Sequence, residues 1–321
     1  MTLSIVVPTA GRPGPLRTTL EALGADAGLT DDSEVLVVES GPPEGAEAVA
    51  AAVASKLPVE VRYFSEVLPG LHEARHRGAR MARHEIVAFL DDDATVASGW
   101  AAAIVSPFVD PEVACVGGPV TVVYDGEPPP WLGQFDPWYL SALDLGAERR
   151  ELRWPEGVNG CNLAVRRQAL LAVGGFNPDA FADPAMVWLR GDGEGGLQRK
   201  FRDAGLRVVY EPGARVDHLI PRARLTPAAF ARRAYLEGIS ASFTALRERG
   251  FSGGYSAALV LGAVRAIARA GRRQVTAMVV PDRAVRARAD TAFWLAYAAH
   301  HLRALTSASL RAHIGRANFL T

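Results

Sequence analysis

The sequence predicts an α/β protein in which a mixed, mostly parallel sheet is flanked by helices and followed by a C-terminal helical appendage. Short apolar runs alternate with segments of helical periodicity up to about residue 218, which is the pattern of βαβ units with parallel strands. From about Leu225 the composition shifts to Ala, Arg and aromatic residues at helical spacing. We therefore expect a first domain over residues 1–224 and a helical region over residues 225–321.

The composition narrows the class of protein. The chain has 321 residues, of which 49% are hydrophobic, so it can bury a large core. Because 35 Lys and Arg balance 35 Asp and Glu, the net charge gives no reason to expect nucleic acid as a partner. The apolar run over residues 255–264 is too short to span a bilayer. Residues 3–7 form a strand near the start, so we expect no signal peptide and a cytoplasmic protein.

The first part of the chain alternates strictly between strands and helices. The strands are apolar runs that end in polar or turn-forming residues, and the helices repeat apolar residues every three to four positions. We expect strands at residues 3–7, 35–38, 59–64 and 86–90. We expect helices at residues 16–24, 44–57 and 71–83.

The remainder is less regular. Strand-like runs over residues 113–123 are followed by a Pro-rich, aromatic connection over residues 125–139. Its aromatic side chains either form a wall of a substrate site or close one end of the core. We expect a strand and then a helix within residues 158–167, and a strand at residues 208–210. Further helices are expected at residues 197–205, 227–249, 255–270 and 284–305.

The fourth strand carries the clearest functional signal. Its five apolar residues indicate a strand buried on both faces, and Asp91, Asp92 and Asp93 follow at once. Ligands of open α/β sheets bind beyond the carboxyl ends of the strands. Three adjacent carboxylates repel one another, and a bound Mg²⁺, Mn²⁺ or Ca²⁺ ion would relieve that repulsion. The alternative is an acidic surface turn in which Asp93 caps the next helix.

The order of several motifs resembles that of the family-2 inverting glycosyltransferases of the GT-A (Rossmann-like) fold. The resemblance extends from Ser4 to about His218. The motifs, in order, are Ile5-Val6-Val7-Pro8-Thr9, Val37-Val38-Glu39-Ser40, Gly70-Leu71-His72-Glu73-Ala74-Arg75, Phe89-Leu90-Asp91-Asp92-Asp93, Asn159-Gly160-Cys161-Asn162, Gly174-Gly175-Phe176 and Asp192-Gly193-Glu194.

The resemblance implies a hexosyltransferase that uses a nucleotide-diphosphate donor, with a UDP-sugar favoured, and a glycan, lipid-linked or small-molecule acceptor. We expect one inverting transfer rather than processive synthesis. A divalent cation, Mn²⁺ or Mg²⁺, would stabilise the leaving diphosphate. By the match to the DxD motif, Asp93 would bind the metal and Asp91 the metal or the ribose, with Asp92 as the variable middle position. His218 is either a further metal ligand or a structural residue.

The general base is expected in the acidic turn before the helix over residues 197–205. The family commonly has Glu-Asp there, and Gly193-Glu194 departs from that pattern. Either Asp192 or Glu194 could take the acceptor proton, and we favour Glu194. The alternative is that Asp192 caps the helix and Glu194 favours its positive end.

The resemblance places the nucleotide-sugar at the ends of the first strands. Glu39 stands where the family usually has Asp. Arg75 matches the family's Arg in Ala-Arg-Asn, although a solvated helix residue is the alternative. The donor-binding residues implied in this way are Pro8, Thr9, Arg12, Glu39, Arg75, Asp91, Asp92 and Asn162.

Other hypotheses stay open. The departures at Glu39 and Gly193 keep a non-catalytic sugar-nucleotide or glycan-binding protein as the alternative function. A nucleotidyltransferase is less favoured, because the loop over residues 11–14 is short and lacks Lys. A basic amphipathic pattern over residues 259–273 indicates either core packing or peripheral contact with the inner membrane face. An oligomer is compatible with the sequence.

Overall fold

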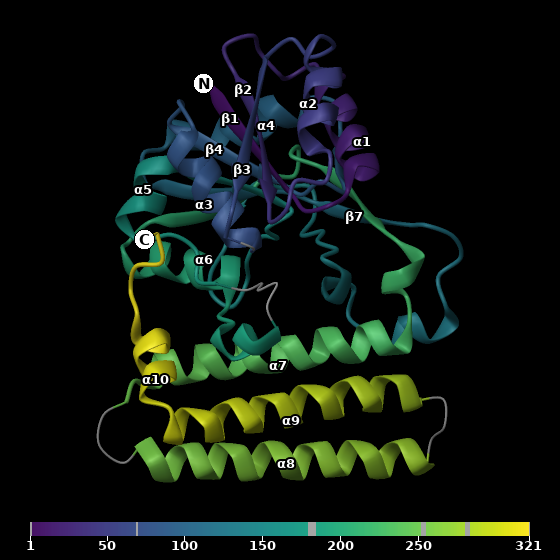
Figure 1. Cartoon of the computed structure of the whole chain (residues 1–321), viewed down its shortest axis with the longest axis vertical. Helices are drawn as coiled ribbons and strands as arrows, with labels where there is room; N and C mark the ends of the chain where they lie inside the picture. Colours follow the sequence, from purple (N-terminus) through teal and green to yellow (C-terminus); the bar gives the residue numbers. More distant parts are fainter. Residues whose placement is uncertain (1, 69, 179–183, 252–254, 280–282, 321) are drawn as a thin grey trace.

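The computed structural model describes residues 2–68, 70–178, 184–251, 255–279 and 283–320. Figure 1 shows an α/β part above a layer of long helices. The strands are β1 Leu3–Thr9, β2 Glu34–Ser40, β3 Glu60–Glu66, β4 Ile86–Leu90, β5 Ala94–Val96, β6 Val113–Gly117, β7 Val120–Tyr124, β8 Arg150–Glu151, β9 Asn162–Arg166, β10 Arg207–Tyr210 and β11 Val216–Ile220. The α-helices are α1 Pro13–Gly24, α2 Ala46–Ala54, α3 Leu71–Met81, α4 Trp100–Val105, α5 Arg167–Ala172, α6 Gly193–Asp203, α7 Pro227–Arg249, α8 Tyr255–Val279, α9 Ala284–Thr306 and α10 Ala308–Gly315. Short 3-10 helices are η1 Ser106–Val109, η2 Pro130–Gln134, η3 Pro137–Leu140, η4 Pro184–Leu189 and η5 Arg222–Arg224.

The main sheet has the strand order β3-β2-β1-β4-β9-β6-β10-β8. β1 pairs in parallel with β2 and β4, and β2 pairs in parallel with β3, whereas β9 runs antiparallel to β4 and β6. The chain moves outward from β1 to β3 and then returns to β4 on the other side of β1. Right-handed crossovers therefore place α1 and α2 on one face and α3 on the other. The predicted mixed, mostly parallel sheet with flanking helices is confirmed.

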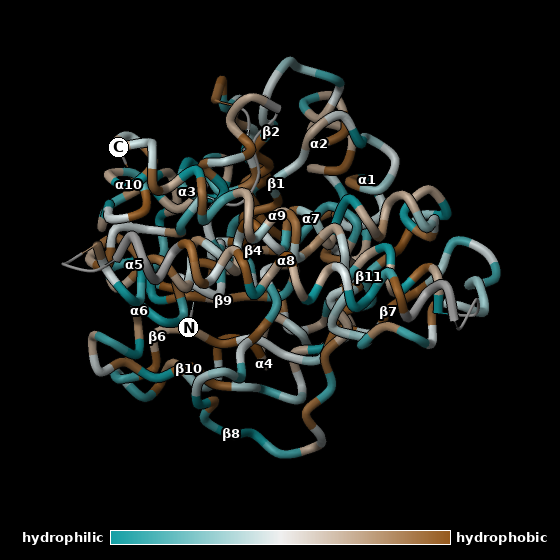
Figure 2. The backbone as a smooth tube through the Cα atoms, turned by 90° about the horizontal axis from the view of Figure 1, so that it is seen from below, coloured by the Kyte–Doolittle hydropathy of each residue, from teal (hydrophilic) through white to brown (hydrophobic). Residues whose placement is uncertain are grey.

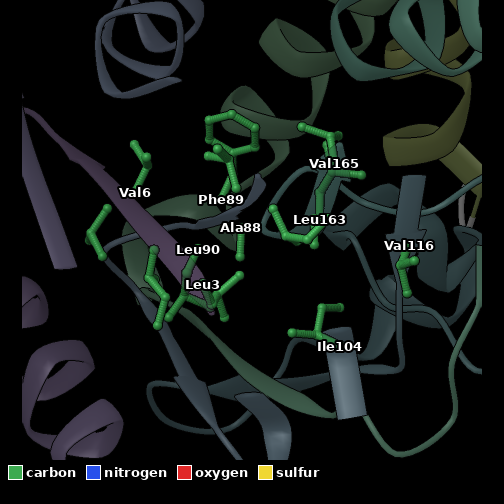
Figure 3. Close-up of a cluster of buried hydrophobic side chains, with 14 of the residues drawn as sticks. Leu3, Val6, Ala88, Phe89, Leu90, Ile104, Val116, Leu163 and Val165 are labelled. Carbon is green, nitrogen blue, oxygen red and sulfur yellow. The ribbon is translucent and has the colours of Figure 1, made fainter. Parts of the chain in front are cut away.

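The core lies between the central strands and these helices. Every residue of β4 is buried, as its uninterrupted apolar run predicts. Figure 3 shows Val6, Phe89 and Leu163, from the neighbouring strands β1, β4 and β9, in one apolar cluster. α3 approaches β1 at Gly78, where an added Cβ would lie 2.3 Å from a methyl carbon of Val6. Only a residue without a side chain allows this close contact between the helix and the strand.

A second, three-stranded sheet with the order β5-β11-β7 continues from the end of β4. β5 begins at Ala94, directly after Asp93, and pairs antiparallel with β11 so that Ala94 lies opposite His218. The Leu219 amide donates to the Asp93 carbonyl over 2.9 Å. The sequence did not predict β5, because a strand of three residues is too short to show periodicity. The passage of the chain from one sheet to the other is what brings His218 beside Asp93.

The helical layer consists of α7, α9 and α8, with α9 between the other two (Figure 1). The helix predicted over residues 255–270 is longer than expected, because α8 continues through Gly271 to Val279. A Gly inside a helix costs about 1 kcal/mol and need not end it. α10 was not predicted either. Within the described ranges, no helix is both long and apolar enough to cross a membrane.

The aromatic connection packs against the helical layer. The ring centroid of Phe135 lies 4.7 Å from that of Phe230 in α7, and the Trp131 centroid lies 4.9 Å from it. Tyr139 stacks on Phe230 at 5.1 Å, and Arg286 of α9 lies over Phe135 at 5.2 Å. These aromatic side chains pack in a second apolar cluster with α7 and α9, separate from the core of the main sheet, so they have a packing role but not the predicted one of closing that core.

Candidate active site

Asp92, the middle carboxylate after β4, is fully buried and holds the loop that follows β1. Its Oδ2 accepts a 2.5 Å hydrogen bond from Thr9 Oγ1, and its Oδ1 accepts from Arg12. Its backbone carbonyl accepts from Thr19 on α1 over 3.0 Å. Burial raises the pKa of Asp92 to about 7, against the opposing effects of Arg12 and Thr9. We therefore revise its predicted contact with the nucleotide-sugar to a role in positioning Thr9 and Arg12.

Asp93 and His218 form a buried pair, with side chains 5% and 4% exposed. His218 Nε2 lies 3.4 Å from Asp93 Oδ1. Burial alone would raise the pKa of Asp93, but His218 and Arg12 outweigh burial and lower that pKa to about 2. Asp93 is therefore ionised at neutral pH. The second ring nitrogen of His218, Nδ1, is buried and has no hydrogen-bond partner among the described residues.

Two arginines face the Asp93 carboxylate. Arg12 donates to Asp93 Oδ2 over 2.5 Å, and Arg224 NH1 lies 3.9 Å from the same oxygen. Arg224 was not among the predicted site residues; the available signal was the basic segment Arg222-Ala223-Arg224, which follows β11 after Pro221. Guanidinium groups present a planar fork of donors that matches phosphate oxygens. The surroundings of Asp93 therefore suit a cation together with a diphosphate.

The Asp93–His218 pair fits a divalent cation that takes its remaining ligands from outside the protein. Among the residues that the structure describes, no group of three or more metal-ligating side chains occurs. Mg²⁺ in phosphate-transfer sites commonly has one or two carboxylate ligands and completes its shell with water and substrate phosphates. One carboxylate and one imidazole meet that requirement, and the imidazole suits Mn²⁺ better than Mg²⁺.

Arg75 of α3 is buried and links the end of β4 to the loop before β9. Its NH2 donates to Asp91 Oδ1 and to the Gly160 carbonyl, both over 2.8 Å. Its guanidinium lies over the Phe176 ring at 5.6 Å. Because its side chain is 1% exposed, the alternative of a solvated helix residue is wrong. Arg75 orients Asp91, whose own side chain remains 23% exposed.

Asp192 is occupied by contacts inside the protein. It stands at the N-cap position of α6, but its side chain makes no capping hydrogen bond. It accepts instead from Asn177 Nδ2 over 2.6 Å and from Thr244 Oγ1 of α7 over 2.7 Å. Arg199 NH1 lies 3.8 Å from the same carboxylate. The alternative in which Asp192 caps the helix is therefore wrong for its side chain, which ties α6 to α7.

Glu194 lies in the first turn of α6 and faces the site. In the described part of the chain, its carboxylate makes no hydrogen bond or ion pair. An added Cβ at Gly160 would lie 3.2 Å from Glu194 Cδ and 2.8 Å from Arg75 NH1. Glu194 thus lies beside the Arg75–Asp91 pair. Because Gly160 has no side chain, the Glu194 carboxyl group and the Arg75 guanidinium can both approach the backbone there. Of the two candidate bases, Glu194 is the one with an unengaged carboxylate.

The ends of β1 and β2 meet as predicted, but Glu39 is turned inward. The strand register places Thr9 opposite Glu39, one residue after the buried Pro8. Glu39 is 1% exposed, and its carboxylate accepts from the Glu44 amide over 2.7 Å and from Tyr63 Oη over 2.8 Å. It therefore holds the segment before α2. We revise its predicted contact with the nucleotide base to this supporting role.

The Asn162 side chain also makes its hydrogen bonds to other groups of the protein. Its Oδ1 accepts from Trp100 Nε1 over 2.9 Å. Its Nδ2 donates to the carbonyls of Pro119 and Ala214 over 3.3 and 2.7 Å. The side chain is fully buried, so we revise the predicted contact with the donor. Asn162 instead joins β9 to α4 and to the segments that precede β7 and β11.

A sequence model of glycosyl transferase family 2 matches residues 4–174, which is more than half of the chain. The chain is 28% identical over 223 residues to the pre-mycofactocin glycosyltransferase of Mycobacterium tuberculosis, covering 67% of this chain and 42% of that protein. It is 25% identical over 182 residues to the glucosyl-dolichyl phosphate glucuronosyltransferase of Haloferax volcanii, covering 53% and 54%. The chain thus spans about half the length, or less, of these curated relatives.

The fold is shared with solved structures. A mannosyltransferase from Pyrobaculum calidifontis, solved with GDP-mannose and Mn²⁺, matches 96% of this chain and 75% of its own, with TM-score 0.55 and 20% identity. TarS from Staphylococcus aureus matches 74% of this chain and 39% of its own, with TM-score 0.51 and 16% identity. These likenesses confirm the predicted GT-A fold. Because the segment matched by the family model contains β1 to β4, the aspartates at residues 91–93 and Arg75, we conclude that the chain belongs to glycosyl transferase family 2.

Proposed function

We propose that this protein is a metal-assisted, inverting glycosyltransferase that moves one hexose from a nucleotide-diphosphate sugar to an acceptor hydroxyl. The observation that carries the proposal is the contrast between two neighbouring groups. Asp93, His218, Arg12 and Arg224 converge on one point. Glu194 lies beside the Arg75–Asp91 pair, and its carboxylate is unengaged among the described residues. A leaving diphosphate needs the first group, and an acceptor hydroxyl needs the second.

The donor diphosphate would bind beside Asp93. Arg12 and Arg224 supply two guanidinium groups for its oxygens. Asp93 and His218 would hold Mn²⁺ or Mg²⁺, which when bound acts as a Lewis acid on the leaving group. Thr9, held by Asp92, lies at the end of β1 beside this position. We keep a UDP-sugar as the favoured donor, although a related fold was solved with GDP-mannose.

Glu194 is the proposed general base. Its carboxylate takes the proton of the acceptor hydroxyl while the acceptor oxygen forms its bond to the anomeric carbon. The bond from that carbon to the diphosphate breaks in the same step, so the configuration inverts. Arg75 keeps Asp91 in place beside this reaction centre. The acceptor class remains a glycan, a lipid-linked sugar or a small molecule, and the proposed location is the cytoplasm.

Glu194→Gln and Asp192→Asn test the choice of base. Both substitutions remove one charge and keep the shape of the side chain. We expect Glu194→Gln to lower kcat by about 10²–10⁴-fold while the dissociation constant for the donor, measured by calorimetry with Mn²⁺, stays within about threefold. Asp192→Asn should lower stability, because it weakens the contacts to Asn177 and Thr244, with a smaller effect on kcat.

Equal kcat in Glu194→Gln and wild type would remove Glu194 as the base. Donor binding by the wild type without turnover of any acceptor would favour the non-catalytic alternative.

A further inference from the structure

α8 is the outermost helix of the molecule (Figure 1). It packs on α9 alone within the helical layer, since α9 separates it from α7. Among residues 260–275, whose side chains the structure describes, those that α8 buries are small, namely Ala263, Ala266 and Ala270. Figure 2 views the molecule from below, with α8 in front, and its tube alternates between apolar and polar residues. One face of α8 therefore packs on α9. The opposite face, which we call the open face, is exposed to solvent.

The open face carries a stripe of large apolar side chains. Val260, Val264, Ile267 and Val275 are 45–61% exposed and follow one another at intervals of four, three and eight residues. These intervals place them on one side of a helix. Leu261, which is 48% exposed, extends the stripe. Single exposed apolar residues are ordinary, but a continuous stripe indicates a surface that contacts another apolar phase.

The charges of α8 are of one sign. Residues 255–279 contain four arginines and no Asp, Glu or Lys. Arg265 and Arg272 are exposed, and both lie next to the apolar stripe. Arg269 lies over the Trp294 ring at 4.4 Å, and Arg273 is paired with Asp290 at 3.2 Å. A helix with an apolar stripe bordered by arginine is typical of helices that lie in the interface of an anionic membrane.

A basic cavity lies at the end of the same helix. Its volume is about 280 Å³, and among the described residues its lining has three arginines, Arg273, Arg283 and Arg286, and one carboxylate, Asp290. Arg286 donates to Asp290 over 2.9 Å and to a backbone carbonyl over 2.8 Å. Three guanidinium groups around one carboxylate leave an excess of positive charge, and guanidinium groups match phosphate oxygens.

The charge pattern separates two candidate occupants of the open face. A second copy of this chain on a two-fold axis would bring α8 against α8, because such interfaces bring the same surface patch of both subunits together. That arrangement would oppose arginines to arginines. An anionic lipid surface instead complements them and accepts the apolar stripe. We propose that the open face of α8 docks on an anionic phospholipid bilayer, with the helix in the plane of the interface and Arg265 and Arg272 at the level of the lipid phosphates.

Vesicle cosedimentation of the full chain tests this proposal without any measurement of activity. The test variants are Val264→Glu/Ile267→Glu, which breaks the stripe, and Arg265→Glu/Arg272→Glu, which reverses its charge. Val109→Glu is the matched control, because Val109 is 74% exposed on the α/β part. We expect wild type and Val109→Glu to sediment with phosphatidylglycerol-containing vesicles, at least about tenfold more tightly than with phosphatidylcholine alone. Each double variant should lose at least about tenfold in affinity, with an unchanged far-UV circular dichroism spectrum.

Three outcomes would overturn the proposal. One is a wild type that stays in the supernatant with anionic vesicles at low salt. Another is a pair of double variants that bind as tightly as the wild type. The third is concentration-dependent self-association of the wild type, seen by analytical ultracentrifugation and abolished by Val264→Glu/Ile267→Glu, which would assign the face to a second copy. Because these readouts need neither donor nor acceptor, they are independent of the proposed transferase activity.

Discussion

At the scale of single residues, burial decides which polar side chains can meet a ligand. Asp92 and Asp93 are adjacent in sequence, yet burial raises the pKa of Asp92 to about 7, whereas His218 and Arg12 outweigh burial and lower the pKa of Asp93 to about 2. The first carboxylate is an internal hydrogen-bond acceptor, and the second is a fixed anion at the site.

Asn substitutions at these two positions are expected to differ. Asp93→Asn removes the charge that would hold the cation, so we expect kcat/KM to fall by at least about 100-fold. Asp92→Asn replaces a carboxyl group that is already partly protonated at neutral pH, so we expect a loss below about tenfold. Initial rates at saturating Mn²⁺ and pH 7 measure both effects. Equal losses in the two variants would contradict the division of roles.

Asn162→Leu is expected to destabilise the fold. The substitution leaves the Trp100 N–H and the Ala214 carbonyl buried without this partner, whereas the Pro119 carbonyl keeps its bond from the Val216 amide. Each unsatisfied buried group costs about 1–3 kcal/mol, so the free energy of unfolding should fall by about 2 kcal/mol or more. Urea denaturation measures the loss, with the exposed Thr18→Ala as control. A stable variant that no longer binds the donor would instead support the original prediction that Asn162 contacts the ligand.

At the scale of elements, the close packing of α3 on β1 connects the core to the site. α3 contributes Gly78 to that packing, and three residues earlier in the same helix it contributes Arg75 to the site. Residues three and four apart share one face of a helix. The contact at Gly78 therefore sets how far Arg75 reaches toward Asp91.

Gly78→Ala tests this contact. The new methyl group would overlap Val6, and overpacking of a core commonly costs about 1–3 kcal/mol. Gly271→Ala in α8 is the control, because its Cβ would meet nothing within 4 Å and removing a helical Gly should stabilise by about 0.5–1 kcal/mol. We expect urea midpoints to move in opposite directions for the two variants. Two shifts of the same sign and size would show that α3 and β1 adjust without cost.

At the scale of the whole molecule, the helical layer is joined to the α/β part through buried polar groups. Ser242 Oγ of α7 lies 2.7 Å from His300 Nδ1 and 2.6 Å from His301 Nδ1, both on α9. His300 Nε2 lies 3.0 Å from the Trp188 carbonyl of η4. If His300 donates to that carbonyl, Ser242 must donate to His300 Nδ1 and accept from His301 Nδ1–H. This chain of hydrogen bonds needs a neutral His300 ring, because its Nδ1 must accept, whereas His301 donates from Nδ1–H whether it is neutral or protonated.

Acidification is therefore expected to weaken the molecule. Burial lowers the pKa of His300 and His301 to about 4 each, below the ordinary value of about 6.5 that applies to the unfolded chain. Between these values the unfolded chain binds more protons, so stability falls as the pH drops from about 6.5 to about 4. At pH 5 the loss should be on the order of 2 kcal/mol for each histidine relative to pH 7.5, or about 4 kcal/mol for the pair.

A comparison with His300→Gln/His301→Gln isolates this effect. The raised pKa of Asp92 acts in the opposite direction over the same range, but it is present in both proteins. Urea unfolding at pH 7.5 and pH 5 should give a smaller pH dependence for the double variant, which should also be the less stable protein at pH 7.5. The same pH dependence in both proteins would show that these histidines do not titrate on unfolding.

The sequence by itself determined the class of fold and the position of the acidic turn. Periodicity and the apolar run of β4 are local properties, and the carboxyl end of such a strand is where α/β sheets bind ligands. The sequence also predicted α7 over its observed residues 227–249 from helical spacing, and the structure adds the Thr226 cap at its start.

Only the tertiary structure decided which side chains are free to act. The sequence favoured Glu194 but left Asp192 open as the base, and the two differ because Thr244, far along the chain, donates to Asp192. Arg224 and His218 reach Asp93 through the pairing of β5 with β11 and the short helix that follows it. Each of these outcomes depends on contacts between distant segments. Local propensity and spacing carry no information about such contacts, whereas burial and hydrogen-bond partners follow from them directly.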